Sequence, residues 1–235
     1  MKVKIIVVLV IFVGVVIASL KLGRAVYMPA VKKVKGKATV TTVKEDLKDV
    51  VKKRLKSPLK SQGFDDYPNK IAILAFKDER KLEVYGWKDN QPKLIKTYDF
   101  TAFSGFLGPK LREGDKQIPE GVYKMEYLNP NSSYHLSIKV SYPNDFDRRK
   151  GKLEGRKKLG GDIFIHGKAV TIGCIPIGDI AIEELFVLAS SVKTGIEIII
   201  SPRDFRKNSQ FPEIEGITWE KELYGPIQQA LNNYL

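Results

Sequence analysis

The chain has 235 residues, of which 43% are hydrophobic, 29% charged and 10% aromatic. This composition excludes a largely disordered chain and suffices for one core of ordinary domain size. The formal net charge of +13 favours a polyanionic neighbour: a nucleic acid, an anionic membrane face or an anionic wall polymer. The sequence has no zinc-finger spacing, recognition-helix signature or aromatic-basic RNA motif, so we expect no nucleic-acid partner.

The N-terminal segment has the pattern of an export signal. Two lysines precede the uncharged run 5–20, and basic residues follow it. No convincing small-residue cleavage site closes the segment 1–24, so the pattern favours an uncleaved signal anchor over a cleaved signal peptide. We expect the rest of the chain to be exported, beginning with a basic tether and an N-terminal helix over residues 25–69.

The remaining chain is predicted to be mainly β. Strand composition recurs in seven segments: 71–76, 81–87, 94–103, 122–127, 134–142, 162–165 and 196–200. The polar residues 77–80 join the first two segments into a predicted hairpin. Glycine, proline and aspartate between residues 105 and 121 indicate a structured loop. We predict a mainly β fold with a few helices, of a β-sandwich or barrel-like kind with its site on the loops.

Helical periodicity is confined to three segments. The first, 45–56, is expected to end at Ser57-Pro58. Asp179 is expected to cap the second, whose apolar face comprises Ile182, Leu185, Phe186 and Ala189. The third, 219–235, is expected to break at Gly225-Pro226 and forms most of a helical extension over residues 204–235.

The segment 143–161 is strongly basic and contains several glycines. It is interpreted either as a solvated loop or as a basic lip beside an acidic substrate. The sequence alone leaves both interpretations open.

The chain has one cysteine, Cys174, and two histidines. No intramolecular disulfide is possible, and these ligands are too few for a structural zinc site, so no metal is expected. His166 ends a predicted strand and precedes Cys174 by eight residues, a spacing in which imidazole and thiol can meet across a loop. A neighbouring imidazole raises the reactive thiolate fraction. On spacing alone, a structural histidine beside a buried cysteine remains the alternative.

The residues around the thiol have predicted roles of their own. Gly173 lets the backbone turn before Cys174, and the N–H groups of these two residues are candidate oxyanion donors. Thr171 is expected either to hydrogen-bond near His166 or to stabilise the local turn.

Two ordered elements, Ile165-His166-Gly167 and Thr171-Ile172-Gly173-Cys174, resemble the L,D-transpeptidase (YkuD-type) catalytic domain family. The similarity is closest to the murein L,D-transpeptidase branch with a short His-Gly to Gly-Cys spacing, and it extends over residues 70–203. The commonest form of the family has a histidine where this chain has Ile172 and an arginine where it has Pro176. Both departures fit that branch.

The resemblance implies acyl transfer on peptidoglycan without a cofactor. Cys174 would attack the L,D-amide after the third residue of a stem peptide, with His166 as general base and acid, and form a thioester. An amine would resolve it in a transpeptidase, and water in a hydrolase that cuts links between the wall and an attached protein. A non-catalytic wall-binding module is the second alternative, and a basic nucleic-acid or membrane-surface protein is the third.

The resemblance also implies a cell-envelope location. The protein would be anchored in the inner membrane and face the periplasm, or be secreted into it, with stem peptides and a wall-attached protein as candidate partners. Candidate substrate-binding residues are His135, Tyr142, Asn144 and Gly167. His135 is alternatively a strand-end histidine satisfied by the backbone.

Overall fold

The computed structural model describes residues 37–235, of which Val40–Leu235 form one compact unit. The predicted signal anchor and most of the tether lie outside the described residues. Within residues 37–235, none of the helices combines the length and the apolar character that a membrane span requires.

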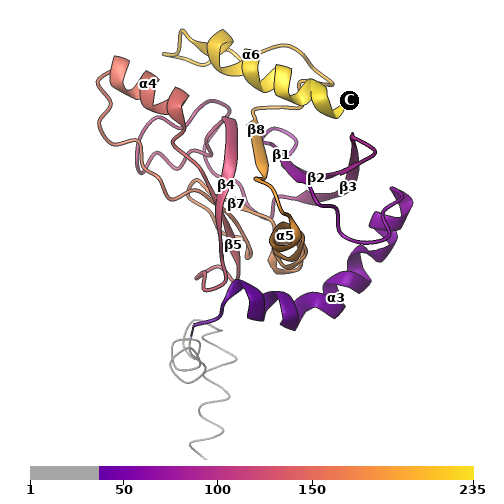
Figure 1. Cartoon of the computed structure of the whole chain (residues 1–235). Helices are drawn as coiled ribbons and strands as arrows, with labels where there is room; N and C mark the ends of the chain where they lie inside the picture. Colours follow the sequence, from indigo (N-terminus) through magenta and orange to yellow (C-terminus); the bar gives the residue numbers. More distant parts are fainter. Residues whose placement is uncertain (1–36) are drawn as a thin grey trace, which may run out of the picture. The chain divides into compact units, whose positions relative to one another are not determined.

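Eight strands form one curled sheet in the order β3-β2-β1-β8-β4-β5-β6-β7 (Figure 1). The pairs β1/β8 and β6/β7 are parallel, and the others are antiparallel. The Thr101 N–H, just after β3, donates to the Pro176 carbonyl of β7 at 2.9 Å and links the two ends of this order. The predicted mainly β fold is confirmed. The strands are β1 (Ile71–Phe76), β2 (Lys81–Lys88), β3 (Gln91–Asp99), β4 (Gly121–Asn129), β5 (Ser137–Val140), β6 (Phe164–His166), β7 (Ile175–Pro176) and β8 (Glu197–Ser201).

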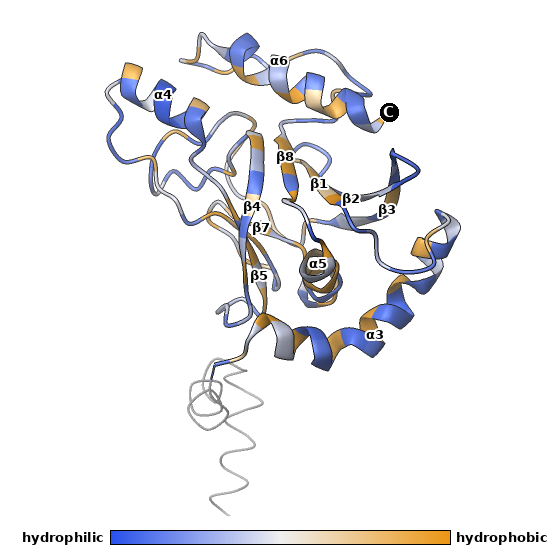
Figure 2. Ribbon diagram, in the orientation of Figure 1, coloured by the Kyte–Doolittle hydropathy of each residue, from blue (hydrophilic) through white to orange (hydrophobic). Residues whose placement is uncertain are grey.

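The concave face of the sheet is filled by α5 (Asp179–Ser191), which Figure 1 shows end-on between the sheet and α3 (Val40–Ser61). Figure 2 shows hydrophobic residues on α5 beside a smaller number of hydrophilic ones. The predicted apolar face of this helix is buried: Ile182, Leu185, Phe186 and Ala189. Burial of each of the three larger side chains contributes about 1.5–3 kcal/mol, so this helix organises the larger core.

The opposite face of β1 and β8 is covered by α6 (Glu220–Leu231) and the short 3-10 helix η1 (Asn232–Tyr234). Odd-numbered residues of β1 pack into the larger core, whereas even-numbered residues pack into a second cluster with Leu223 and Tyr224 of α6. A strand covered on both faces is apolar throughout, which explains the continuous apolar run in 71–76.

Two prolines do not end helices where the sequence suggested. The helix α3 continues through Pro58 to Ser61, and α6 continues through Pro226. In α3, Val51, Leu55 and Leu59 form one buried stripe that extends beyond the proline. Tertiary packing thus outweighs the local cost of a missing backbone hydrogen bond.

The basic segment 143–161 contains a helix, α4 (Asp145–Leu153), where we expected a loop. Asn144 and Asp147 form a reciprocal capping box: each side chain accepts the other residue's backbone N–H at 2.9 Å. The predicted cap of α5 is also wrong, because the N-cap is Gly178 and Asp179 instead accepts hydrogen bonds from Lys168.

A fully buried ion pair holds the long loop that precedes β4. Lys77, just after β1, lies 2.8 Å from Glu120 and donates to the carbonyls of Gly108 (2.8 Å) and Ile118 (2.9 Å). Glu120 accepts from the Gly108 N–H at 2.7 Å and from the Tyr224 hydroxyl at 2.8 Å. This pair therefore ties β1, the loop, β4 and α6 together.

Lys77→Met should lower the free energy of unfolding by about 3–5 kcal/mol, because it leaves the Glu120 carboxylate buried without its cation. Chemical denaturation measures this change. Adding Glu120→Gln should recover part of the loss, because it removes the unpaired charge. Lys81→Met, which removes an exposed pair with Asp99, serves as the control and should cost about 0–1 kcal/mol. Equal losses for the two lysine variants would contradict the role of the buried pair.

Candidate active site

The short strands β6 and β7 bring Cys174 and His166 to the same face of the sheet. Ile165 pairs with Ile175 and His166 with Pro176. Both isoleucines are fully buried in the core, so the alternation of a strand directs His166 to the opposite face. Continuing the register by one residue places Cys174 beside Phe164, two positions from His166 and on that same face.

The thiol of Cys174 lies against the backbone that leads into β6. It donates to the Asp162 carbonyl at 3.5 Å. Burial raises the pKa of Cys174, and the Phe164 backbone N–H, Lys139 and Lys110 oppose this shift. The thiol is therefore protonated in the resting site and needs a base for activation.

The imidazole of His166 is buried and oriented by the backbone. Its Nδ1 lies 2.5 Å from the Gly167 carbonyl oxygen, so Nδ1–H donates and Nε2 retains its lone pair in the neutral ring. Burial lowers the pKa of His166, which keeps the ring neutral near neutral pH. The Tyr134 ring covers this imidazole, with centroids 4.6 Å apart and planes tilted by 30°. No carboxylate is needed to fix the tautomer.

Gly173 occupies a position that no other residue fits well. Its φ is +130°, and a Cβ atom there would lie 3.0 Å from the Gln117 carbonyl oxygen. The turn before Cys174 therefore combines a backbone conformation that favours glycine with close packing against the loop before β4. Gly167 is similarly close-packed, since a Cβ there would lie 2.8 Å from the Tyr134 carbonyl oxygen.

The Thr171 hydroxyl organises this turn. It accepts from the N–H groups of Gly173 (3.1 Å) and Cys174 (2.9 Å) and donates to the Cys174 carbonyl (2.7 Å). The structure thus supports the turn role of Thr171. An oxyanion at these two N–H groups would compete with the Thr171 oxygen.

Three of the predicted substrate-binding residues have structural contacts. The His135 Nε2 lies 2.8 Å from Glu183 of α5, which also accepts from Arg54 of α3. Tyr142 is buried, and its hydroxyl donates to the Leu159 carbonyl at 3.0 Å. Asn144 caps α4. A role for these side chains in binding substrate stays a prediction.

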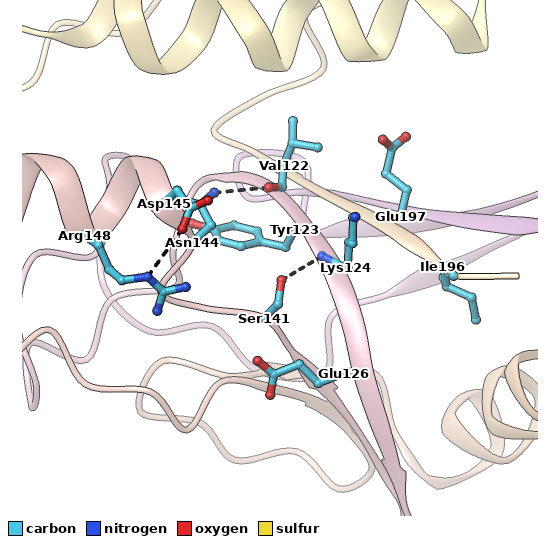
Figure 3. Close-up of a pocket in the computed structure, with 11 residues that line it drawn as sticks. Val122, Tyr123, Lys124, Glu126, Ser141, Asn144, Asp145, Arg148, Ile196 and Glu197 are labelled. Carbon is cyan, nitrogen blue, oxygen red and sulfur yellow. Dashed lines mark hydrogen bonds and ion pairs between the residues drawn. The ribbon is translucent and has the colours of Figure 1, made fainter.

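Asn144 also lines a cavity of about 570 Å³ along β4 (Figure 3). Its amide donates to the Val122 carbonyl at 3.1 Å, and Arg148 of α4 lies beside Asp145. Neither Cys174 nor His166 lines this cavity. Arg148, from the predicted basic lip, is therefore directed to a different hollow of the described surface.

Two buried lysines near the thiol were missed by sequence reasoning. Lys139 is 7% exposed and donates to the carbonyls of Val140, at 3.3 Å, and Gly161. Lys110 is 6% exposed and is paired with Asp115 at 2.5 Å. Both lower the pKa of Cys174. The sequence signals were a lysine inside a predicted strand and a lysine inside a predicted loop, and neither reveals burial.

Within residues 37–235, no group of three or more His, Cys, Asp or Glu side chains is arranged to hold a metal ion. The groups that act on Cys174 are backbone groups, Lys139, Lys110 and the carboxylate of Asp162. The described site thus holds groups suited to proton transfer and nucleophilic attack.

The family model of the L,D-transpeptidase catalytic domain (YkuD) matches residues 70–200, which is more than half of the chain. The chain belongs to this family. The resemblance drawn from the two motifs around His166 and Cys174 is therefore confirmed at the level of the family.

A relative and two solved structures are similar to this L,D-transpeptidase domain. The chain is 38% identical over 118 residues to the "Putative L,D-transpeptidase YafK" of Escherichia coli (strain K12), covering 49% of this chain and 46% of that protein. The match thus spans about half the length of the relative. The helical cell shape determining protein Pgp2 from Campylobacter jejuni is 23% identical, with 63% of this chain and 55% of that chain covered and a TM-score of 0.48. Bd1075 of Bdellovibrio bacteriovorus is 21% identical, with 74% of this chain and 58% of that chain covered and a TM-score of 0.42.

Gly173→Ala should lower the free energy of unfolding of this L,D-transpeptidase domain by about 2 kcal/mol, because it forces a Cβ into a strained conformation against Gln117. Thermal and chemical denaturation measure the loss. Gly161→Ala is a matched control near the same site, since a Cβ there meets nothing within 4 Å; its effect should stay within about 0.5 kcal/mol. Equal effects of the two substitutions would contradict the packing argument.

Alkylation of Cys174 by iodoacetamide should accelerate steadily as pH rises through and above the ordinary thiol range, because only the thiolate reacts and burial raises its pKa. Lys139→Met should move this profile to higher pH, since it removes a positive charge that lowers the pKa. His166→Gln should leave the profile nearly unchanged. A plateau of high reactivity already present below neutral pH would indicate a thiolate-imidazolium pair and contradict the neutral resting state.

Proposed function

We propose that the protein is a cysteine-dependent peptidoglycan L,D-transpeptidase that acts on tetrapeptide stems. Cys174 attacks the carbonyl of the L,D-amide after the third stem residue while His166 accepts the thiol proton. The C–N bond then breaks, His166 returns the proton to the leaving D-residue amine, and the acyl group remains on sulfur as a thioester. An acceptor amine displaces the thiolate and forms the new amide.

One observation carries this proposal: the only thiol of the chain shares a sheet face with a buried imidazole whose Nε2 is free to accept a proton in the neutral ring. General-base activation requires a neutral imidazole and a protonated thiol, and the two pKa directions supply both. Membership of the L,D-transpeptidase family supplies the reaction class.

The two departures from the commonest family motif have a structural counterpart in this chain. Pro176 lies within β7, and Ile172 is 75% exposed on the turn before the thiol. Neither offers a charge to the site. In this proposal Lys139 and Lys110 provide the positive field near Cys174 that stabilises developing negative charge.

The proposed substrate places the domain at the cell wall. The N-terminal signal would hold it in the inner membrane, facing the periplasm, or export it there. The family match and the name of its 38% identical relative refer to L,D-transpeptidases, which supports a role in the wall.

The proposal is tested by incubating the full chain with purified tetrapeptide muropeptides and following both enzyme and products by intact mass. We expect an acyl adduct on Cys174, release of the terminal D-alanine and formation of cross-linked dimers. Cys174→Ala should abolish all three, and His166→Gln should slow adduct formation about 10²–10⁴-fold. Circular dichroism of each variant controls for folding.

The acceptor is resolved in the same experiment. Adduct formation followed by tripeptide without dimers would show that water resolves the thioester, as in the hydrolase alternative. Wall carrying covalently attached protein tests whether such links are cut. If the parent forms no adduct and binds muropeptides as well as Cys174→Ala does, the catalytic proposal is wrong and a wall-binding module replaces it.

A further inference from the structure

The connection between β4 and β5, residues 130–136, places an aromatic ring over the proposed catalytic imidazole. His166 is 1% exposed, whereas Tyr134, whose ring stacks on it, is 44% exposed, so this ring covers the imidazole on its solvent side. Burial lowers the pKa of His166, and the hydrogen bond to the Gly167 carbonyl opposes this shift. The Tyr134 ring therefore contributes to the desolvation that keeps the imidazole neutral.

The backbone of this β4–β5 connection has an unfavourable conformation at His135. Its φ is +77°, in the left-handed region that favours glycine. The connection is also closely packed, since a Cβ at Gly167 would lie 2.8 Å from the Tyr134 carbonyl oxygen and 3.1 Å from the His135 Cβ. Such a conformation persists only where surrounding contacts hold it. A shift of His135 would displace the neighbouring Tyr134 as well.

The side chain of His135 supplies a contact of this kind. Its Nε2 lies 2.8 Å from Oε1 of Glu183 in α5, and Oε2 of the same carboxylate accepts from Arg54 of α3 at 2.8 Å. A carboxylate only accepts hydrogen bonds, so Nε2–H of His135 donates. The side chains of His135 and Glu183 are 15% and 16% exposed, so water competes little for this bond. The connection is thus attached to the helix that fills the larger core.

We propose that His135 is a positioning residue, which anchors the β4–β5 connection to Glu183 and so holds the Tyr134 ring over the His166 imidazole. The importance of His166 in this proposal rests on the proposed function. The positioning role requires no contact between His135 and substrate. Without the anchor, the ring moves away, water reaches the imidazole, and the pKa of His166 rises toward its ordinary value.

The chain has only two histidines, so a variant at His135 retains one imidazole, that of His166. NMR titration of the full chain with isotope-labelled histidine measures its chemical shift and pKa. Stacking on Tyr134 should shift the ring protons of His166 upfield. His135→Leu should reduce that upfield shift and raise the pKa of His166. His135→Gln, which keeps an N–H donor for Glu183, should recover most of both changes.

The comparison of these two variants isolates the hydrogen bond. Both remove the imidazole of His135 and any charge on it, and both place a side chain of similar size at the same positive φ. Tyr134→Ala should change His166 in the same direction as His135→Leu does. The double variant should change it no more than Tyr134→Ala alone, because His135 acts through Tyr134.

A matched control concerns the next residue of α5. Lys96→Met removes an ion pair of 2.6 Å with Glu184, which is as deeply placed in the same helix. It should lower the free energy of unfolding without altering the chemical shift or the pKa of His166. A general loss of stability is thereby distinguished from a loss of positioning.

Thioester formation with tetrapeptide muropeptides is the second measurement. His135→Leu should lower the maximal rate at neutral pH about fivefold and change KM less than about twofold. The rising limb of its pH profile should move to higher pH, because the neutral base is populated only above the raised pKa of His166. His135→Gln should have a rate and a profile closer to those of the parent.

Two results overturn the positioning role of His135. One is an unchanged chemical shift and pKa of His166 in His135→Leu, and the other is an equal change in His135→Leu and His135→Gln. If the parent forms no thioester, the proposed function fails, and the imidazole signal, which needs no substrate, decides the positioning role by itself.

Discussion

The ion pair between Lys77 and Glu120, both fully buried, is the constraint on which the site depends. Removing two charges from water is unfavourable unless each finds several partners, and here backbone groups of Gly108 and Ile118 and the Tyr224 hydroxyl supply them. The loop before β4 is therefore held at Gly108, near its middle, and at Ile118 and Glu120, near its C-terminal end. This fixes the position of Gln117. Its carbonyl oxygen lies so close to residue 173 that only glycine, which has no Cβ atom, fits there.

In the proposed catalytic pair, both side chains are held by backbone carbonyls. His166 is oriented by the Gly167 carbonyl, and the thiol rests against the Asp162 carbonyl. Backbone partners cannot change protonation state, so they hold the imidazole in one tautomer across a wide pH range. Thr171 then completes the turn with its hydroxyl. The N–H groups of Gly173 and Cys174 already donate to the Thr171 hydroxyl oxygen. An oxyanion formed during acylation of Cys174 would therefore have to displace that oxygen or bind to other donors.

Sequence patterns correctly predicted those helices and strands in which the spacing of apolar residues matches the residues that are buried. The hairpin of β1 and β2 and the apolar face of α5 are confirmed because alternation and helical spacing directly reflect burial. Predictions were wrong where tertiary packing overrides local signals, as at Pro58, or where a short cap outweighs composition, as with Asn144 and Asp147 at the start of α4. The burial of Lys139 depends on strands distant in sequence, so no single-sequence pattern could reveal it.

Basic residues of two kinds, a buried pair and an exposed group, differ in what their charges act on. Lys139 and Lys110 are buried, so their fields act through a poorly polarisable interior and affect the pKa of Cys174. Arg112, Lys157 and Lys158 are exposed, so solvent screens them and they act only on a ligand in contact. An arginine two residues after the nucleophile would combine both effects in one side chain. In this chain Pro176, which carries no charge, occupies that position within β7.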